Sequence, residues 1–96
     1  MFAIILRPDA ANEYEEAVSW YALRGRIAAD KFVEAVQERL LAIASDPLRY
    51  KRVFRDYREV STRKYPYGIV YYVEDDLIVV VAIYHHRRNP KKRFRR

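Results

Sequence analysis

The stretch Tyr65–Arg88 contains two long apolar runs separated by a short acidic segment. Gly68–Val73 and Leu77–Tyr84 are apolar throughout, and Glu74-Asp75-Asp76 lies between them. Apolar runs that are continuous rather than alternating are typical of central strands covered on at least one face. The stretch therefore predicts a buried β-hairpin with an acidic turn, and the rest of the chain has to supply its cover.

Two helical patterns precede this hairpin. The apolar positions of 10–23 follow a 3-4-3 spacing, which places them in one stripe on a helix face. A second stripe runs through 27–44, with Gly25 as the turn residue between the two. Asp46 ends the second helix because a residue before proline is pushed out of the α region. The pattern predicts an antiparallel helical hairpin that packs on the sheet through Ala11, Tyr14, Ala17, Val18, Tyr21, Ala28, Phe32, Ala35, Val36, Leu40 and Ile43.

The remaining segments complete a β-α-α-β-β-β order. Phe2–Leu6 is an apolar run of the length expected for a buried strand. Leu48–Tyr57 predicts a loop with a short extended piece at Arg52–Phe54, and Arg58–Tyr65 predicts a more exposed strand. The expected fold class is therefore α+β: a two-layer sandwich in which the N-terminal strand and helical hairpin pack on a mostly antiparallel sheet.

Composition limits the kind of protein this is. We expect residues 1–96 to form a single domain, with 91–96 as a flexible basic tail. The chain has no cysteine, and its two histidines have no third ligand cluster, so we expect no metal and no cofactor. Met1–Leu6 does not resemble a signal peptide, and no apolar run approaches the roughly 18 residues of a membrane span. The expectation is a cytoplasmic protein without membrane contact.

Positive charge is concentrated in the second half of the chain. Residues 1–50 carry six Lys/Arg and eight Asp/Glu, a net −2, whereas 51–96 carry thirteen and five, a net +8. Seven of the last ten residues are Lys or Arg. This asymmetry indicates either a basic half that meets nucleic acid or an acidic protein, or charge that simply keeps the domain soluble.

The end of the most buried strand carries His85, His86, Arg87 and Arg88. Strand alternation points one histidine towards the helices and the other away. As a catalytic group, a histidine here would act as general acid or base near neutral pH, with a 2′-hydroxyl of RNA as the nucleophile. The alternative is a structural histidine at a strand end. A further hypothesis is that the adjacent strand carries a basic and aromatic binding surface, formed by Arg58, Arg63, Lys64 and Tyr65.

The segments YPYGIVYYVEDD and YHHRRNP, in this element order, resemble the RelE/ParE toxin superfamily. The resemblance covers essentially the whole chain and is most specific in Tyr65-Pro66-Tyr67, Tyr71 and His85-x-Arg87-Arg88-x-Pro90. It implies the toxin of a type II toxin–antitoxin (plasmid stabilisation) system. The implied partner is a cognate antitoxin, acidic and partly disordered, which wraps the toxin in a hetero-oligomer. A homodimer is the other assembly to consider.

The superfamily divides by target. RelE-like members cut mRNA on the ribosome, and ParE-like members poison DNA gyrase without known catalytic residues. The positions of the RelE-like catalytic pattern fall here on Glu59, Ser61, Gly68, Arg88 and Phe94, and only Arg88 agrees. Lost cations mean lost stabilisation of a phosphoryl transition state. In a second nuclease branch, which ends in a His-Tyr pair, His86 would match but Arg87 stands where the tyrosine belongs.

We therefore favour a ParE-like toxin that inhibits DNA gyrase and has no catalytic residue. The predicted surface for the antitoxin or the target consists of Arg58, Arg63, Lys64, Tyr65, His85, Arg87 and Arg88. One alternative is a ribosome-dependent mRNA endoribonuclease that uses His85, His86, Arg87 and Arg88. The other is a non-toxic module of the same fold that binds nucleic acid or protein.

Overall fold

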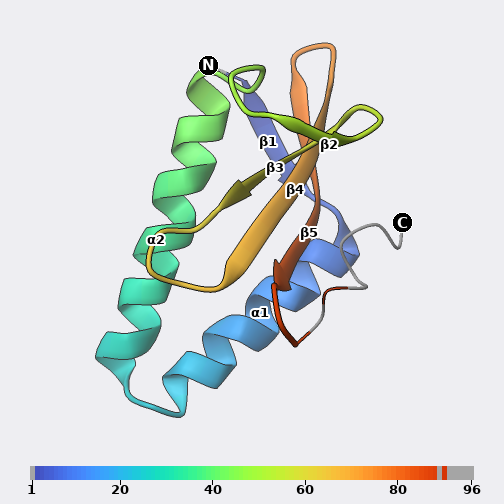
Figure 1. The fold of residues 1–96 in the computed structure, drawn as a ribbon. Coiled ribbons are helices and arrows are strands. Elements are labelled where there is room, and N and C mark those ends of the chain that lie inside the picture. The colour runs from blue at the N-terminus through green and yellow to red at the C-terminus, as the bar shows by residue number, and fades with distance from the viewer. Residues whose placement is uncertain (1, 89, 91–96) are drawn as a thin grey trace.

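Two helices cover one face of a five-stranded sheet in the computed structural model (Figure 1). The structure describes residues 2–88 and Pro90, so the predicted basic tail at 91–96, with Phe94, lies outside the described residues. The elements are β1 (Ala3–Leu6), α1 (Pro8–Ala22), α2 (Arg26–Ser45), β2 (Arg52–Phe54), β3 (Tyr57–Ser61), β4 (Tyr67–Glu74) and β5 (Leu77–His85). The predicted α+β sandwich of a helical hairpin on a sheet is confirmed.

The sheet has the order β1-β5-β4-β3-β2. Its four later strands are antiparallel neighbours, whereas β1 pairs in parallel with β5. The β4–β5 hairpin turns at Asp75 and Asp76, and Asp75 takes a positive φ of 55°. Asp tolerates this left-handed conformation better than most residues, which explains an acidic turn without glycine.

The core lies between the helices and the inner face of the sheet. Phe32, Val36 and Ile43 of α2 are fully buried there, together with Ile69 and Tyr71 of β4. The predicted stripe of α2 therefore faces the sheet. For α1, Ala17 is buried in the same core, and Tyr14, Val18 and Tyr21 pack against it. Burial raises the pKa of Tyr71 to about 12, and its hydroxyl donates to Pro47 O at 2.6 Å. That bond ties the segment after α2 to the centre of the sheet.

The predicted strand Arg58–Tyr65 is shorter in the structure. β3 ends at Ser61, because the Thr62 N–H donates to Tyr67 O at 3.0 Å and its hydroxyl donates to Tyr65 O at 3.0 Å. These bonds close a turn in which Lys64 has a φ of 68°. The expectation that Arg63 and Lys64 lie on a strand beside Arg58 was therefore wrong, since both lie in this turn.

The N-terminal strand covers only the beginning of β5. Four residues of β1 pair with Leu77–Val80, and the Arg7 N–H then donates to Val80 O at 2.9 Å. Further along, α1 takes over: Glu13 Oε1 accepts the Ile83 N–H at 3.0 Å. Helix α1 is thereby fixed beside the C-terminal end of β5. In the described part of the chain, neither helix combines the length and apolar character needed to cross a bilayer.

Candidate functional site

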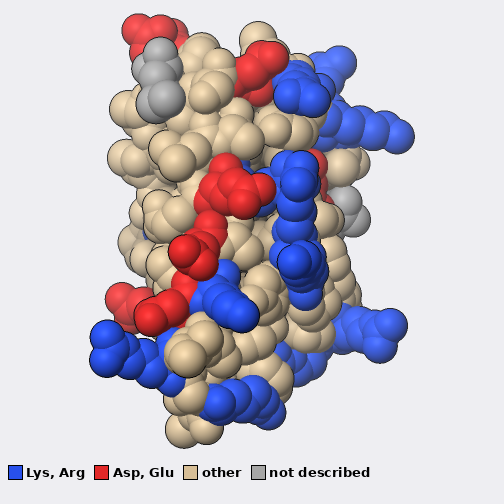
Figure 2. Space-filling view, turned by 90° about the vertical axis from the view of Figure 1, so that its left-hand side faces the viewer, with Lys and Arg blue, Asp and Glu red and all other residues tan. Residues whose placement is uncertain are grey.

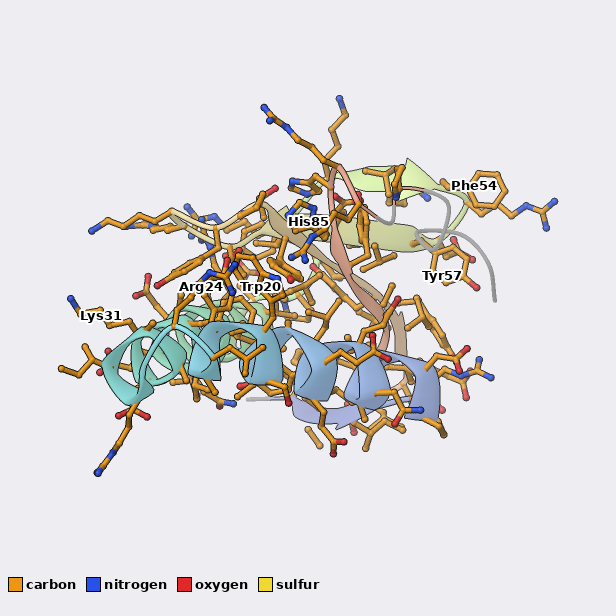
Figure 3. The ribbon with its side chains drawn as sticks, turned by 90° about the horizontal axis from the view of Figure 1, so that it is seen from below. Trp20, Arg24, Lys31, Phe54, Tyr57 and His85 are labelled. Atoms are coloured by element: carbon orange, nitrogen blue, oxygen red, sulfur yellow. The ribbon has the colours of Figure 1, made fainter. Side chains whose placement is uncertain are left out.

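Helix α1 and the C-terminal end of β5 enclose a pocket of about 170 Å³. One wall comes from the helix and the other from the sheet and the turn after β5. Figure 3 shows Trp20 and His85 on these opposite walls, with Arg24 beside Trp20. The lining residues are Glu13, Glu16, Ala17, Trp20, Tyr67, Ile83, His85 and Arg88. The pocket thus joins two of the predicted site residues, His85 and Arg88, to side chains from the first helix.

His85 is held by its own chain. Its Nδ1 accepts the backbone N–H of Arg87 at 3.1 Å and that of Arg88 at 2.9 Å. An Nδ1 that accepts must lack a hydrogen, so the neutral ring carries its hydrogen on Nε2. Burial lowers the pKa of His85, and the charges of Arg88 and Arg87 lower it further. The neutral ring therefore has no vacant acceptor nitrogen for a substrate proton.

Arg88 lies over the indole ring of Trp20, with its Cζ 4.7 Å from the ring centroid. Its Nη2 donates to the Tyr67 hydroxyl at 3.1 Å. Arg24 stacks on the same indole ring with its Cζ at 3.3 Å, and its Nη1 donates to Trp20 O at 3.0 Å. Two guanidinium groups from distant parts of the sequence thus converge on one aromatic ring, where cation–π attraction holds them.

The chemistry of the pocket favours binding. Its hydroxyl group belongs to Tyr67, whose pKa is raised by burial although Arg88 opposes that shift. Its carboxylates come from Glu13 and Glu16, on the helix wall opposite His85. The pocket thus combines one guanidinium, that of Arg88, with two carboxylates and a histidine ring that donates through Nε2 when it is neutral.

A second cluster lies on the sheet face turned away from the helices and contains His86, so His86 is the one of the two histidines that points away. Its Nε2 is 3.6 Å from Glu59 Oε2, and the same oxygen accepts the Tyr84 hydroxyl at 2.8 Å. The side chain of Glu59 is only 10% exposed, against 33% for His86. Gly68 makes room for them, because a Cβ there would lie 2.6 Å from Glu59 Oε2 and 2.9 Å from His86 Nε2.

The other predicted surface residues lie outside the pocket. Arg58 Nη1 donates to the carbonyls of Leu48 and Tyr50, so this guanidinium supports the segment after α2. Arg63 is 3.8 Å from Glu38 of α2, in an exposed pair. The structure therefore does not gather the whole predicted docking set into one patch.

Lys64 and Tyr65 lie in the β3–β4 turn, beside a shallow groove against α2. The Tyr65 ring packs edge-on against Phe32 at 5.2 Å and against Tyr21 at 5.3 Å, so much of this side chain serves the core. Arg87 is exposed and contributes its backbone N–H to His85. Among the described residues, no three His, Asp or Glu side chains form a group that could hold a metal ion.

Sequence reasoning did not identify Trp20 and Arg24 as site residues. A signal was present, since the only tryptophan of the chain lies near the end of a predicted helix and an arginine follows it four residues later. Which strand end the helix meets depends on the crossing of α1 over β5. Local periodicity carries no information about this crossing.

The fold resembles two solved toxin–antitoxin structures. A chain of the chromosomal ParDE TA system from P. aeruginosa superimposes with a TM-score of 0.77 at 18% identity, covering 88% of this chain and 96% of that chain. A chain of the intact E. coli RelBE toxin–antitoxin complex gives 0.62 at 16% identity, covering 86% and 94%. At such identities the likeness concerns the fold.

No curated protein gives a significant match to the chain. The family model described as ParE toxin of type II toxin–antitoxin system, parDE, matches residues 4–90. That match includes both helices, all five strands apart from the first residue of β1, and the turn that carries His85 and Arg88. The chain therefore belongs to the ParE toxin family of type II toxin–antitoxin systems.

Proposed function

We propose that this single-domain chain is the toxin of a plasmid-stabilisation pair and that it inhibits DNA gyrase by docking. In this proposal an acidic, partly disordered antitoxin holds the toxin inactive in a hetero-oligomer. The match of residues 4–90 to the ParE toxin family supports this proposal. DNA gyrase is the target that we predicted for the ParE-like branch of the superfamily. Gyrase works in the cytoplasm, so the proposal also implies that location.

The state of His85 is the observation that favours docking over catalysis. A general base needs a free acceptor nitrogen within reach of the proton that it removes. The acceptor nitrogen of His85 is occupied by the N–H groups of Arg87 and Arg88. Its neighbour Arg88 is bonded to Tyr67 and stacked on Trp20, which positions a cation for recognition.

The binding surface that we propose for the antitoxin or gyrase centres on Arg88 and His85 at the pocket. Arg87 is exposed beside them. Arg63, Lys64 and Tyr65 form a separate area against α2, and Arg58 supports the loop between α2 and β2. Two areas on one small protein suit a partner that wraps around it.

A supercoiling assay with purified gyrase and plasmid tests the proposal. Excess wild-type protein is expected to stop supercoiling or to trap cleaved plasmid. Arg88→Ala is expected to relieve this effect, because it removes the cation at the pocket. Arg55→Ala is the matched control, since Arg55 is an exposed arginine in the distant β2–β3 turn. Full supercoiling in the presence of a large excess of wild-type toxin would refute the gyrase target.

An mRNA endoribonuclease is the second candidate, and the pairing of His86 with Glu59 favours it. A carboxylate beside an imidazole can share the proton of an attacking hydroxyl. This cluster has Gly68 where a nuclease of this superfamily is expected to place an arginine, which leaves the transition state without that cation. Primer extension on mRNA from induced cells distinguishes the two: discrete cuts that disappear in Glu59→Gln and His86→Ala would establish the nuclease.

A further inference from the structure

The backbone of the turn after β5 is held by a side chain. His85 Nδ1 accepts the N–H of Arg87 at 3.1 Å and the N–H of Arg88 at 2.9 Å. One residue earlier, the His86 N–H donates to Pro66 O at 2.8 Å. Two successive N–H groups therefore share one imidazole nitrogen as their acceptor at the point where the chain leaves the sheet. We call His85 Nδ1 and these two N–H groups the latch.

The latch determines where the Arg88 side chain starts. From that position the guanidinium reaches the Tyr67 hydroxyl, to which Nη2 donates at 3.1 Å, and the ring of Trp20, whose centroid is 4.7 Å from Cζ. The imidazole of His85 packs edge-on against the ring of the same Tyr67, at 5.2 Å between centroids. Trp20 and His85 lie on opposite walls of the pocket (Figure 3). Arg88 connects these walls, and the imidazole sets its position through the backbone.

A protonated His85 cannot form the latch. The acceptor nitrogen uses its lone pair for the two N–H groups, whereas an imidazolium carries a hydrogen on both nitrogens and accepts nothing. Protonation of Nδ1 would direct its hydrogen at the hydrogens of Arg87 and Arg88. Turning the ring over would place a carbon atom there, which is no acceptor either. Both hydrogen bonds are therefore lost in the charged form.

The groups around the ring oppose one another in their effect on its charge. They come from α1, from β4 and from the chain next to His85: Glu13, Glu16, Tyr67, His86, Arg87 and Arg88. The carboxylates on the helix favour the charged ring, whereas burial and the neighbouring cations disfavour it. Burial lowers the pKa of His85 most, followed by the charge of Arg88. The neutral ring, and with it the closed latch, is thus the state above pH 6.5.

We propose that His85 is a positioning residue and a pH-sensitive switch: its neutral ring holds Arg88 over Trp20, and its protonation opens the latch and releases Arg88 from the pocket. The regulating ligand is a proton. The consequence for gyrase rests on the proposed function, because the docking surface centred on Arg88 and His85 is complete only while His85 is neutral. The opening of the latch itself is independent of the target.

The emission of Trp20 tests the opening of the latch on the full 96-residue chain, since Trp20 is its only tryptophan. A guanidinium that leaves the indole ring changes the surroundings of the ring and shifts its emission. Between about pH 8 and about pH 5 we expect one sigmoidal shift. Its midpoint should lie below pH 6.5 and should coincide with the titration of His85 followed by ¹⁵N NMR. A constant emission, or a midpoint that differs from that of His85, would refute the latch.

Three variants assign the shift to its groups. His85→Asn keeps an oxygen acceptor but does not titrate, so its emission should stay constant with pH. In Arg88→Gln the NMR titration of His85 should persist while the emission shift is lost. Arg24→Gln is the matched control, because Arg24 stacks on the same ring with its Cζ at 3.3 Å, and this variant should keep the shift. A shift that survives in Arg88→Gln and disappears in Arg24→Gln would assign the signal to the wrong arginine.

A carboxylate and global unfolding are the two other sources of such a shift. Glu16 lines the pocket with Trp20, and Glu16→Gln should still show the shift. Its matched control is Glu38→Gln, since Glu38 lies 3.8 Å from Arg63 on the α2 side, where Figure 2 shows acidic and basic side chains next to one another. Loss of the shift in Glu16→Gln alone, or loss of the helical circular dichroism signal at the same midpoint, would overturn the inference.

Hydrogen exchange follows the two N–H groups of the latch directly. The amides of Arg87 and Arg88 should exchange at similar rates in the wild type and in His85→Asn at about pH 8. One pH unit below the midpoint, the wild type should exchange about tenfold faster than His85→Asn at the same pH. Equal rates in the two proteins at both pH values would mean that His85 does not hold these amides.

The supercoiling assay connects the latch to docking. Inhibition by the wild type should weaken relative to His85→Asn as the pH falls through the midpoint, with both proteins compared at each pH. If the latch opens and the two proteins inhibit equally, the latch does not control the docking surface and that part of the inference is refuted. If neither protein inhibits gyrase at any pH, the proposed function fails, whereas the emission and exchange data still decide the latch.

Discussion

At the scale of single residues, two neighbouring histidines have different environments because a strand alternates its faces. His85 faces α1 and is bound to the backbone of the turn that follows it. His86 faces the other side and meets Glu59 and Tyr84. The sequence predicts the alternation. The occupied Nδ1 of His85 was not predictable, since it depends on how residues 86–88 turn back.

The stability of the protein should depend on His85 below neutral pH. Its ordinary pKa is 6.5, and burial lowers it in the fold, so the unfolded chain binds the proton more readily. The free energy of unfolding should therefore be highest above pH 6.5 and should decrease as the pH falls through this value towards the folded pKa. Urea unfolding over this range measures the effect.

The variant His85→Asn separates the effect of protonating His85 from the effect of losing its hydrogen bonds to the backbone of Arg87 and Arg88. The amide oxygen of asparagine can accept the N–H groups of Arg87 and Arg88 but does not titrate. This variant should unfold with a weaker dependence on pH, whereas His86→Asn should keep the contribution of His85. An unchanged acid-side slope in His85→Asn would assign the pH dependence to other groups.

Gly68 should tolerate no side chain. A Cβ would approach Glu59 Oε2, Tyr84 Cε1 and His86 Nε2 to within 2.6, 2.8 and 2.9 Å. Gly68→Ala should therefore cost about 1–3 kcal/mol of the free energy of unfolding. In a Glu59→Ala/His86→Ala background the cost should fall, because two of the three contacts are gone. Equal costs in both backgrounds would mean that the strain arises elsewhere.

At the scale of elements, the helices and central strands were predictable because their apolar spacing is local. The stripe that includes Phe32, Val36 and Ile43 faces the sheet as expected. The start of α1 at Pro8 follows a local signal, since proline suits the first helical position. The end of β3 does not, because it depends on a bond from Thr62 across the turn to Tyr67.

The connection between the helices depends on one backbone conformation. Gly25 has φ 128°, and an added Cβ would meet nothing within 4 Å. Gly25→Ala should thus destabilise the fold through backbone strain alone, by about 1–3 kcal/mol. A D-alanine, introduced by chemical synthesis, prefers this mirror-image region and should remove the penalty. If both alanines cost the same in urea unfolding, strain is not the cause.

At the scale of the whole molecule, β1 and β5 pair in the sheet although they lie far apart in the sequence. β1 pairs with β5 in parallel, Ile5 beside Val79, so the first strand depends on the last. The Arg7 N–H bonds to Val80 O, and the two-residue period of a strand turns the Ile5 N–H to the same side. Parallel pairing of distant strands is a property that no local pattern reveals.

Ile5→Pro tests this pairing. Proline removes the N–H that faces β5 and leaves a buried carbonyl without its donor, at a cost of about 1–3 kcal/mol. Ile5→Thr keeps the N–H and changes only a side chain that is 48% exposed, so it should unfold close to the wild type. Equal unfolding midpoints for the two variants would show that this strand contributes little to the sheet.

Because β1 pairs with β5, the sheet cannot form around β1 until β5 has been synthesised. Translation delivers β1, both helices and their apolar stripes before β5 exists, so the first part of the chain has no sheet to cover. The pocket also needs Ile83, His85 and Arg88, which follow β1 and both helices in the chain and therefore leave the ribosome after them. The pocket therefore forms only after Arg88 has been made, and the apolar stripes of both helices stay exposed until β5 is available to cover them.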